Sequence, residues 1–410
     1  MMLLKNIKTK FSVAKYIEFS SVLMIFLQGF SIKGLHVIDI KLFYFFLIIN
    51  SLLLYTKYGF RLNKYIFLIF TFLSIHGIIN YIIYDFPWGN LIKQIVGIFI
   101  VIVYYYNVIV LFDLKNLFNI YLKLAVIFCV IALIFYPTGI LDKELERLDG
   151  LMSEPSKFIV VNIPALYYFL KKRKYLNAFV LLFGFFLAKS SSGYLAILIM
   201  FLFLSIRKST IKYLGLTIIP IFIIALFLKN NEFYQDRLEA LKENFEIFQT
   251  KTFKNDTNIS SFVLLKSAYV SINNFKDHPL GTGIGSFSEQ HDKYIKLLSM
   301  PRYTVVYDIE NFNREDANSL FLRTLSDLGI FGLGFIILFL FLGFTTYFVN
   351  YDLEKKTIAI GVFIYFLIKL LRMGHYFPEE QYFFLFLFIF TLPKIKFNLS
   401  SSSINNKCIN

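Results

Sequence analysis

The sequence is poor in cysteine and in charged residues for its length. Only two of its 410 residues are cysteines, Cys129 inside an apolar run and Cys408 near the C-terminus, so the chain offers neither a disulfide framework nor a cysteine-based metal site. Charged residues make up 17%, whereas 57% are hydrophobic and 19% are aromatic. A water-soluble domain of this size does not tolerate that balance, so the composition indicates a membrane protein.

Three further absences narrow the class of protein. No small-residue cleavage site follows Gly29, so we expect the first apolar run to be retained as a membrane span rather than removed as a signal peptide. No repeat of about 20–50 residues is apparent, which argues against a repeat array. The net charge is +15, but the basic residues stand in short clusters between apolar runs and form no binding face. We therefore expect no nucleic-acid partner.

Apolar runs long enough to cross a bilayer recur along the whole chain. A hydrocarbon core ~30 Å thick requires roughly 20 apolar residues in a helix. The runs predict about twelve spans and an all-α fold, a polytopic transmembrane helical bundle. The sixth to eighth runs are short, so those spans can be tilted, paired or partly re-entrant. The predicted spans are residues 14–32, 38–56, 64–84, 91–112, 117–137, 157–170, 175–188, 193–206, 211–229, 319–349, 357–372 and 380–393.

Lysine and arginine collect in alternate connections between these spans, and connections rich in these residues face the cytoplasm. The basic connections are the N-terminus and residues 57–64, 171–174, 207–212 and 394–396. We therefore expect both termini to be cytoplasmic. The opposite connections, expected to be external, are residues 85–88, 138–156 and 230–318.

The spans divide the chain into four predicted regions. Residues 1–229 form an N-terminal transmembrane region of about nine spans, and residues 319–393 form a C-terminal one of about three spans. Residues 230–318 are too long for a connector, and their amphipathic periods predict an ordered external loop. Residues 394–410, which contain four consecutive serines, are expected to be a disordered cytoplasmic tail.

Two clusters on the external side are candidates for anion binding. Pro155 suits the first turn of a helix, which would place Arg147 and Glu154 beside a helix N-terminus, where free N–H groups and the helix dipole favour anions. The alternative is a capped, solvated loop. Lys189 and Ser191 stand at the outer start of the eighth span, where the serines can also act simply as helix caps.

A third cluster contains three alternating glycines, including Gly281 and Gly283, directly after His278. No Lys-Ser or Lys-Thr follows as in a P-loop, and the segment is expected outside the cell, where ATP and NAD are not supplied. A tight turn that closes against a ligand or another helix fits better. His278 is a general-base candidate by residue type; alternatively it caps the turn before Pro279.

Two more clusters lie where the chain re-enters the membrane. Asn318 is expected to cap the tenth span, and Arg323 and Asp327 are four residues apart, hence on one helix face. Both charges should face protein or water, either as part of a site or as a structural ion pair. Arg372 and His375 precede the last span, where an arginine can also extend to the lipid headgroups.

These motifs together resemble the O-antigen polymerase family, within the wider O-antigen polymerase and ligase superfamily. The resemblance covers residues 140–380 and rests on the order and spacing of the clusters around one large loop. Members often carry a histidine where this chain has Ala317, and an arginine early in the loop helix where this chain has Asn258, Ser260 and Ser261. Ligases are the usual owners of that histidine, so its absence favours a polymerase.

The resemblance implies a glycosyltransferase of surface-polysaccharide and lipopolysaccharide biosynthesis in the bacterial inner (plasma) membrane, with its active face periplasmic. Its donor and acceptor would be oligosaccharide repeat units on undecaprenyl diphosphate, and its partners the lipid bilayer and a chain-length regulator membrane protein. Arg147 and Arg372 would clamp the diphosphate with support from Lys189, and Glu154 or His278 would be the base. Substrate-binding residues would be Ser191, Gly281, Gly283, Asn318, Arg323, Asp327 and His375.

No carboxylate cage is apparent, so we expect no metal and no cofactor. A flippase for the same lipid-linked oligosaccharide would also have about twelve spans. Two similar halves and short loops would be expected of a flippase, and this sequence has neither. A ligase that uses another acceptor is the alternative within the same superfamily.

Overall fold

The computed structural model describes residues 12–34, 38–139, 147–205, 250–253 and 259–393. These residues are helical apart from short loops and one antiparallel hairpin, β1 (Ser31–Gly34) and β2 (Ile38–Lys41), so the predicted helical class is confirmed. The hairpin corrects the predicted start of the second span, because the helix there begins only at Leu42.

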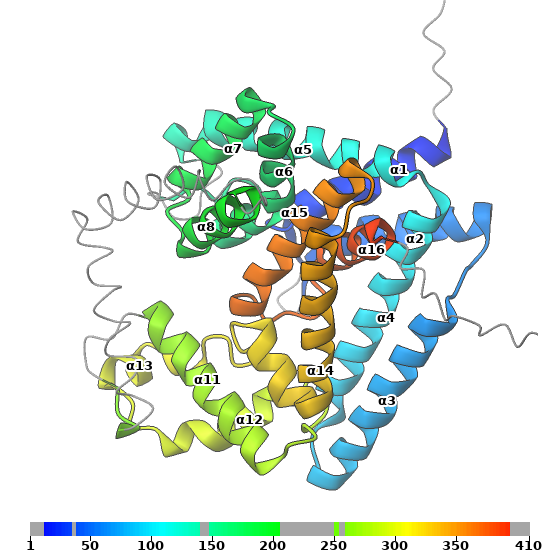
Figure 1. The fold of residues 1–410 in the computed structure, drawn as a ribbon. Coiled ribbons are helices and arrows are strands. Elements are labelled where there is room, and N and C mark those ends of the chain that lie inside the picture. Colours follow the sequence, from blue (N-terminus) through cyan, green and yellow to red (C-terminus); the bar gives the residue numbers. More distant parts are fainter. Residues whose placement is uncertain (1–11, 35–37, 140–146, 206–249, 254–258, 394–410) are drawn as a thin grey trace, which may run out of the picture.

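The described helices follow one another along the chain as Figure 1 labels them. They are α1 (Val13–Leu23), α2 (Leu42–Tyr58), α3 (Lys64–Tyr84), α4 (Trp88–Leu111), α5 (Leu114–Phe135), α6 (Pro155–Lys171), α7 (Tyr175–Leu187), α8 (Ser191–Ser205), α11 (Ile259–Asp277), α12 (Phe287–Tyr294), α13 (Arg302–Val306), α14 (Leu320–Phe348), α15 (Leu353–Leu371) and α16 (Gln381–Thr391). Short 3-10 turns are η1 (Met24–Phe26), η2 (Tyr136–Thr138), η4 (Ile295–Leu297) and η5 (Ile309–Asn311).

Four of these helices are long and apolar enough to cross a membrane, namely α3, α4, α14 and α5 continued through η2. Four shorter apolar helices, α2, α7, α8 and α16, accompany them. The chain is therefore membrane-integral. The number of spans and the orientation remain predictions, since the predicted span 211–229, both termini, the tail and residues 230–249 of the long loop lie outside the described residues.

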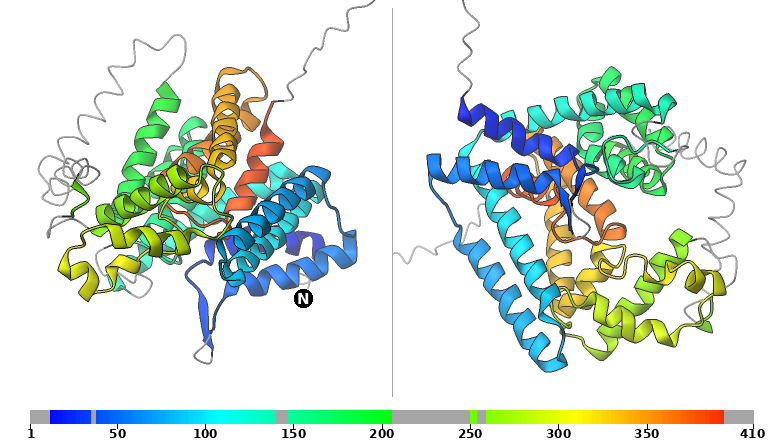
Figure 2. Two further views of the ribbon diagram at one scale, coloured as in Figure 1. Left: turned by 90° about the horizontal axis from the view of Figure 1, so that it is seen from below. Right: turned by 180° about the vertical axis from the view of Figure 1, so that it is seen from behind.

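Helix α6 is buried along most of its length. Every residue from Phe158 to Phe169 is buried, and α15 packs along it, with α7 and α8 on its other sides (Figures 1 and 2). Pro164 interrupts the hydrogen-bond ladder of this helix. The hydroxyl of Tyr121 from α5 bridges two backbone groups next to the proline. It donates to the Val161 carbonyl at 2.7 Å and accepts from the Ala165 N–H at 3.1 Å. No water is available in a bilayer core, so a side chain must supply these bonds.

Residues 259–318 fold into a helical unit beside the bundle, here called the loop module (yellow-green in Figure 1). It has its own apolar core, which includes Phe262, Val270 and Phe287. Lys266 is buried on the polar side of α11, where its ammonium donates to the Glu310 and Phe312 carbonyls at 2.5 and 2.8 Å. Burial lowers the pKa of Lys266 to about 8. The lysine thereby fixes the 310–312 segment against α11.

The glycine turn, residues 279–285, packs against a kink in α14. Gly329 has φ 56° and ψ −132°, which breaks the helix and frees carbonyls above it. Gly283 N–H donates to the Asp327 carbonyl at 2.8 Å, and Ile330 N–H donates to the Pro279 carbonyl at 2.9 Å. A Cβ on Gly281 would lie 2.5 Å from the Asp327 oxygen, so only glycine allows this approach. The turn thus closes against a helix, one of the two options that the sequence left open.

We expect the predicted orientation to be testable at two exposed positions, in a background without Cys129 and Cys408. Lys276→Cys, at the end of α11, should react with a membrane-impermeant maleimide on intact spheroplasts. Lys174→Cys, in the basic turn before α7, should react only after permeabilisation. The reverse pattern would move every candidate residue to the cytoplasmic side.

Candidate functional site

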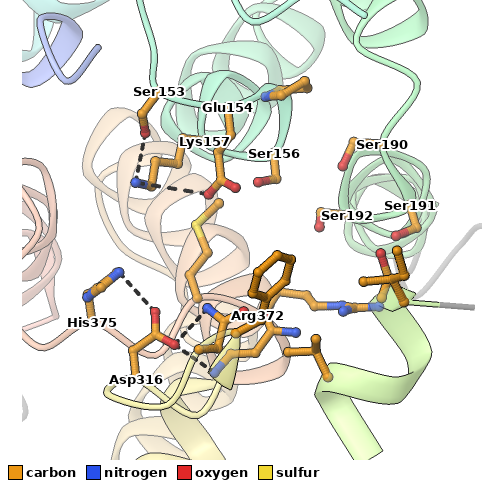
Figure 3. Close-up of a pocket in the computed structure, with 18 of the residues that line it drawn as sticks. Ser153, Glu154, Ser156, Lys157, Ser190, Ser191, Ser192, Asp316, Arg372 and His375 are labelled. Atoms are coloured by element: carbon orange, nitrogen blue, oxygen red, sulfur yellow. Dashed lines mark hydrogen bonds and ion pairs between the residues drawn. The ribbon is translucent and has the colours of Figure 1, made fainter. Parts of the chain in front are cut away.

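One polar cavity of about 410 Å³ lies where the transmembrane bundle meets the loop module. Its walls are the segment 147–157 at the start of α6, the start of α8, the first turn of α11, the loop 312–318 and the segment 372–375 after α15 (Figure 3). These segments are far apart in the sequence. They meet because α15 packs along α6, which brings Arg372 to the same level as Glu154.

Two helix N-termini open on this cavity. Helix α6 begins at Pro155, as the sequence predicted, after Glu154 in extended conformation at φ −163° and ψ 155°. Helix α8 begins at Ser191, and Ser190, Ser191 and Ser192 all line the cavity. The first N–H groups of a helix have no partner within the helix and carry the positive end of its dipole. Two such ends aimed at one space favour an anion there.

Three cationic side chains line the same space: Arg147, Lys157 and Arg372. The Arg147 Nε donates to the Ala188 carbonyl at 3.4 Å, which ties this arginine to the end of α7. The Lys157 ammonium donates to Ser153 Oγ at 2.8 Å and lies 4.0 Å from the Glu154 carboxylate (Figure 3). Against these cations stand two carboxylates, so the lining has a surplus of positive charge.

The second carboxylate, Asp316, is held by three donors. Its carboxylate lies 2.9 Å from His375 Nε2 and accepts from Asn313 Nδ2 at 2.8 Å and from the Asn318 N–H at 3.1 Å. Burial opposes the ionised form, but the His375 ring and these other donors outweigh it and hold the pKa of Asp316 well below its usual range. Asp316 is therefore a fixed negative charge in the wall of the cavity.

The helix cap expected at Asn318 is displaced by one residue. Ser319 occupies the cap position of α14, with extended backbone at φ −158° and ψ 126°, and its hydroxyl accepts from the Leu322 N–H at 3.2 Å. Asn318 itself has φ 51°, in the left-handed region. An N-cap residue needs extended backbone, so Asn318 cannot cap. It lines the cavity instead, and its carbonyl accepts from the Met373 N–H at 3.0 Å.

The structure brings half of the sequence-predicted residues together. The residues that line the cavity are Arg147, Glu154, Ser191, Asn318, Arg372 and His375. The other predicted residues, which lie elsewhere, are Lys189, His278, Gly281, Gly283, Arg323 and Asp327. Lys189 is exposed just past α7 with φ 43°. His278 Nδ1 is hydrogen bonded to the Tyr84 hydroxyl at 3.0 Å, against α3.

Arg323 and Asp327 form the ion pair that the sequence left open as one alternative. Their side chains are buried, with Arg323 Nε 3.7 Å from Asp327 Oδ2. Arg323 also donates to the Gly374 carbonyl at 3.0 Å and stacks over the Tyr376 ring at 4.2 Å. Asp327 accepts from the Gly285 N–H at 2.9 Å. The pair therefore joins α14 to the glycine turn and to the segment that carries His375.

Among the charged residues that line the cavity, sequence reasoning missed Lys157 and Asp316. Lys157 stands three residues after Glu154, in the first turn of α6, where a basic residue opposes the helix dipole and so signals a local function. Asp316 stands two residues before Asn318, a spacing at which an aspartate side chain accepts from the backbone. Nothing in the sequence pairs Asp316 with His375, which is far away in the chain.

The fold and the cavity define a membrane-integral helical protein with a cationic pocket at one end of its bundle. Residues 176–339 match a protein family described as O-antigen ligase, and this match supports the O-antigen polymerase and ligase superfamily that the motifs indicated. Members of this superfamily are membrane glycosyltransferase-like enzymes. The match includes Ser191 and Asn318, whereas Arg147, Glu154, Arg372 and His375 lie outside it. No curated protein matches the chain.

Proposed function

We propose that the chain is an O-antigen polymerase, which joins oligosaccharide repeat units carried on undecaprenyl diphosphate at the external face of the bacterial inner membrane. The observation that supports this most is the single cavity into which two helix N-termini and three cationic side chains point. A diphosphate is a compact anion with several oxygens, and it suits such a site better than a neutral ligand does.

The reaction follows from where charge develops. The acceptor hydroxyl oxygen forms a bond to C1 of the donor sugar, the bond from C1 to the phosphate oxygen breaks, and undecaprenyl diphosphate leaves with the electron pair. Negative charge grows on the leaving diphosphate, where Arg147, Arg372 and the N–H groups of α6 and α8 stabilise it. The proton of the acceptor passes to a base in the cavity wall.

One observation favours a ligase: the family that matches residues 176–339 is described as O-antigen ligase. Ala317, where ligases usually carry a histidine, favours the polymerase. The two functions differ in the surface glycan of host cells that lack this chain. A single repeat unit attached to the lipid core identifies a polymerase, whereas complete absence of attached glycan identifies a ligase and contradicts our proposal.

We expect turnover to require neither ATP nor a divalent cation, because breaking the bond to the diphosphate drives the reaction and cationic side chains stabilise the leaving group. Purified protein in nanodiscs should elongate lipid-linked repeat units at an unchanged rate in excess EDTA. Loss of activity in EDTA that magnesium alone restores would show that a metal ion takes the role assigned to the arginines.

A further inference from the structure

His375 lies where three cavities meet. It lines the cationic cavity, a second polar cavity of about 770 Å³ against the loop module, and a third of about 250 Å³ near Lys41 and Lys93. Asp316 is shared by the first two. The side chain of His375 is 54% exposed, so a bound substrate can reach it.

The second cavity offers the chemistry of a sugar site. Carboxylates and amides from Asp292, Asp308, Asn311 and Asn313 line it, and such groups accept and donate hydrogen bonds to hydroxyls. Asp292 is fixed by an ion pair with Arg314. A neutral oligosaccharide in this cavity and a diphosphate in the cationic cavity would have their reacting ends on either side of His375.

Asp316 determines which nitrogen of the His375 ring carries the proton. Nε2 lies 2.9 Å from the ionised Asp316, which fixes the proton on that nitrogen. The other ring nitrogen, Nδ1, is then the one that can accept a proton. An imidazolium formed in this way is stabilised by the Asp316 charge, as a carboxylate does for a catalytic histidine in many transferases and hydrolases.

We propose that His375 is the general base that takes the proton of the acceptor hydroxyl, and that Asp316 is the residue that positions its ring. The inference rests on the proposed glycosyl transfer and names the group that the transfer requires. The acceptor sugar enters through the 770 Å³ cavity and places its hydroxyl between His375 Nδ1 and C1 of the donor sugar. The proton moves to Nδ1 as the new bond to C1 forms. His278, the other histidine candidate, lines neither the cationic cavity nor the 770 Å³ cavity. Glu154 lines only the cationic cavity, so it does not face both proposed substrates.

The test uses full-length protein in nanodiscs and lipid-linked repeat units extracted from host cells that lack this chain. His375→Ala should lower kcat about 100-fold or more, the effect of a lost general base, with little change in KM. Imidazole added to His375→Ala should raise its kcat at least tenfold. His375→Gln keeps a donor toward Asp316 but no base, so it should be equally slow and insensitive to imidazole. His76→Gln, on α3 and hydrogen bonded to Leu280, is the matched control and should behave as wild type.

Asp316 has a distinct prediction. Asp316→Asn should lower kcat about tenfold in the wild-type background but have no further effect in His375→Gln, because it acts through the histidine. Wild-type rates in His375→Ala, absence of imidazole rescue, or a parallel loss of donor affinity would each overturn the role of His375. If wild-type protein itself releases no undecaprenyl diphosphate from these substrates, the proposed function fails, and the inference with it.

Discussion

Replacement of either cavity arginine is expected to slow polymerisation by about 30-fold to nearly 1000-fold, or roughly 2–4 kcal/mol of transition-state stabilisation. Arg147→Ala and Arg372→Ala each remove a cation from the wall of the 410 Å³ cavity. Charge on the diphosphate is greater in the transition state than in the bound donor, so kcat should fall more than KM rises. The measurement is the rate of lipid-linked glycan elongation by protein in nanodiscs, at matched protein amounts.

Lysine at either position should restore only part of the rate, because an ammonium keeps the charge but loses the two-pronged hydrogen bonding of a guanidinium. Arg61→Ala is a suitable control, since Arg61 is exposed before α3 and does not line the cavity. Long-chain surface glycan at wild-type levels in both alanine variants would contradict the proposal that Arg147 and Arg372 bind the diphosphate. Lys157, the third cation in the cavity wall, would then be the phosphate ligand to examine.

A single methyl group at Gly374 is expected to reduce activity about 100-fold, the typical cost of a ~1 Å misplacement of catalytic groups. Gly374 lies between Arg372 and His375, and a Cβ there would overlap the carbonyl oxygen of Asp316. The segment 372–376 must therefore move away from the loop 312–318. Such a shift separates His375 from Asp316 and draws Arg372 out of the cavity, so Gly374→Ala should lose kcat while the protein still inserts and purifies.

Gly334→Ala is the matched control for this effect. Gly334 lies in α14, and a Cβ there meets no atom within 4 Å. Alanine also favours a helix over glycine by about 1 kcal/mol, so this variant should be at least as stable as wild type and fully active. Thermal denaturation in detergent distinguishes a local shift from unfolding. Wild-type activity in Gly374→Ala would show that the contact between these two segments does not hold the site together.

The local features of the chain follow from its sequence. Apolar runs placed α2–α8 and α14–α16 to within about four residues, because a bilayer requires continuous apolar stretches and backbone bonds closed within each helix. The first predicted span, 14–32, was too long, since α1 ends at Leu23. Pro155 marked the start of α6 because proline fits the first turn of a helix. Arg147, Glu154, Ser191, Arg372 and His375 were recognised as candidates because they are polar residues in predicted external connections, close to the expected ends of helices. Lys189 was selected by its place at the outer start of a span and His278 by its residue type, and neither lines the cavity.

Only the tertiary structure decided which of these candidates meet. Arg372 reaches Glu154 because α15 packs along α6, and no local pattern encodes a helix pairing between segments so far apart. The glycines after His278 serve a contact with the kink at Gly329, which depends on two backbones approaching closely. The Asp316–His375 pair depends on the same kind of approach. Sequence determines what each segment is because helix formation and partition into lipid are local, whereas a site assembled between segments depends on how their surfaces pack.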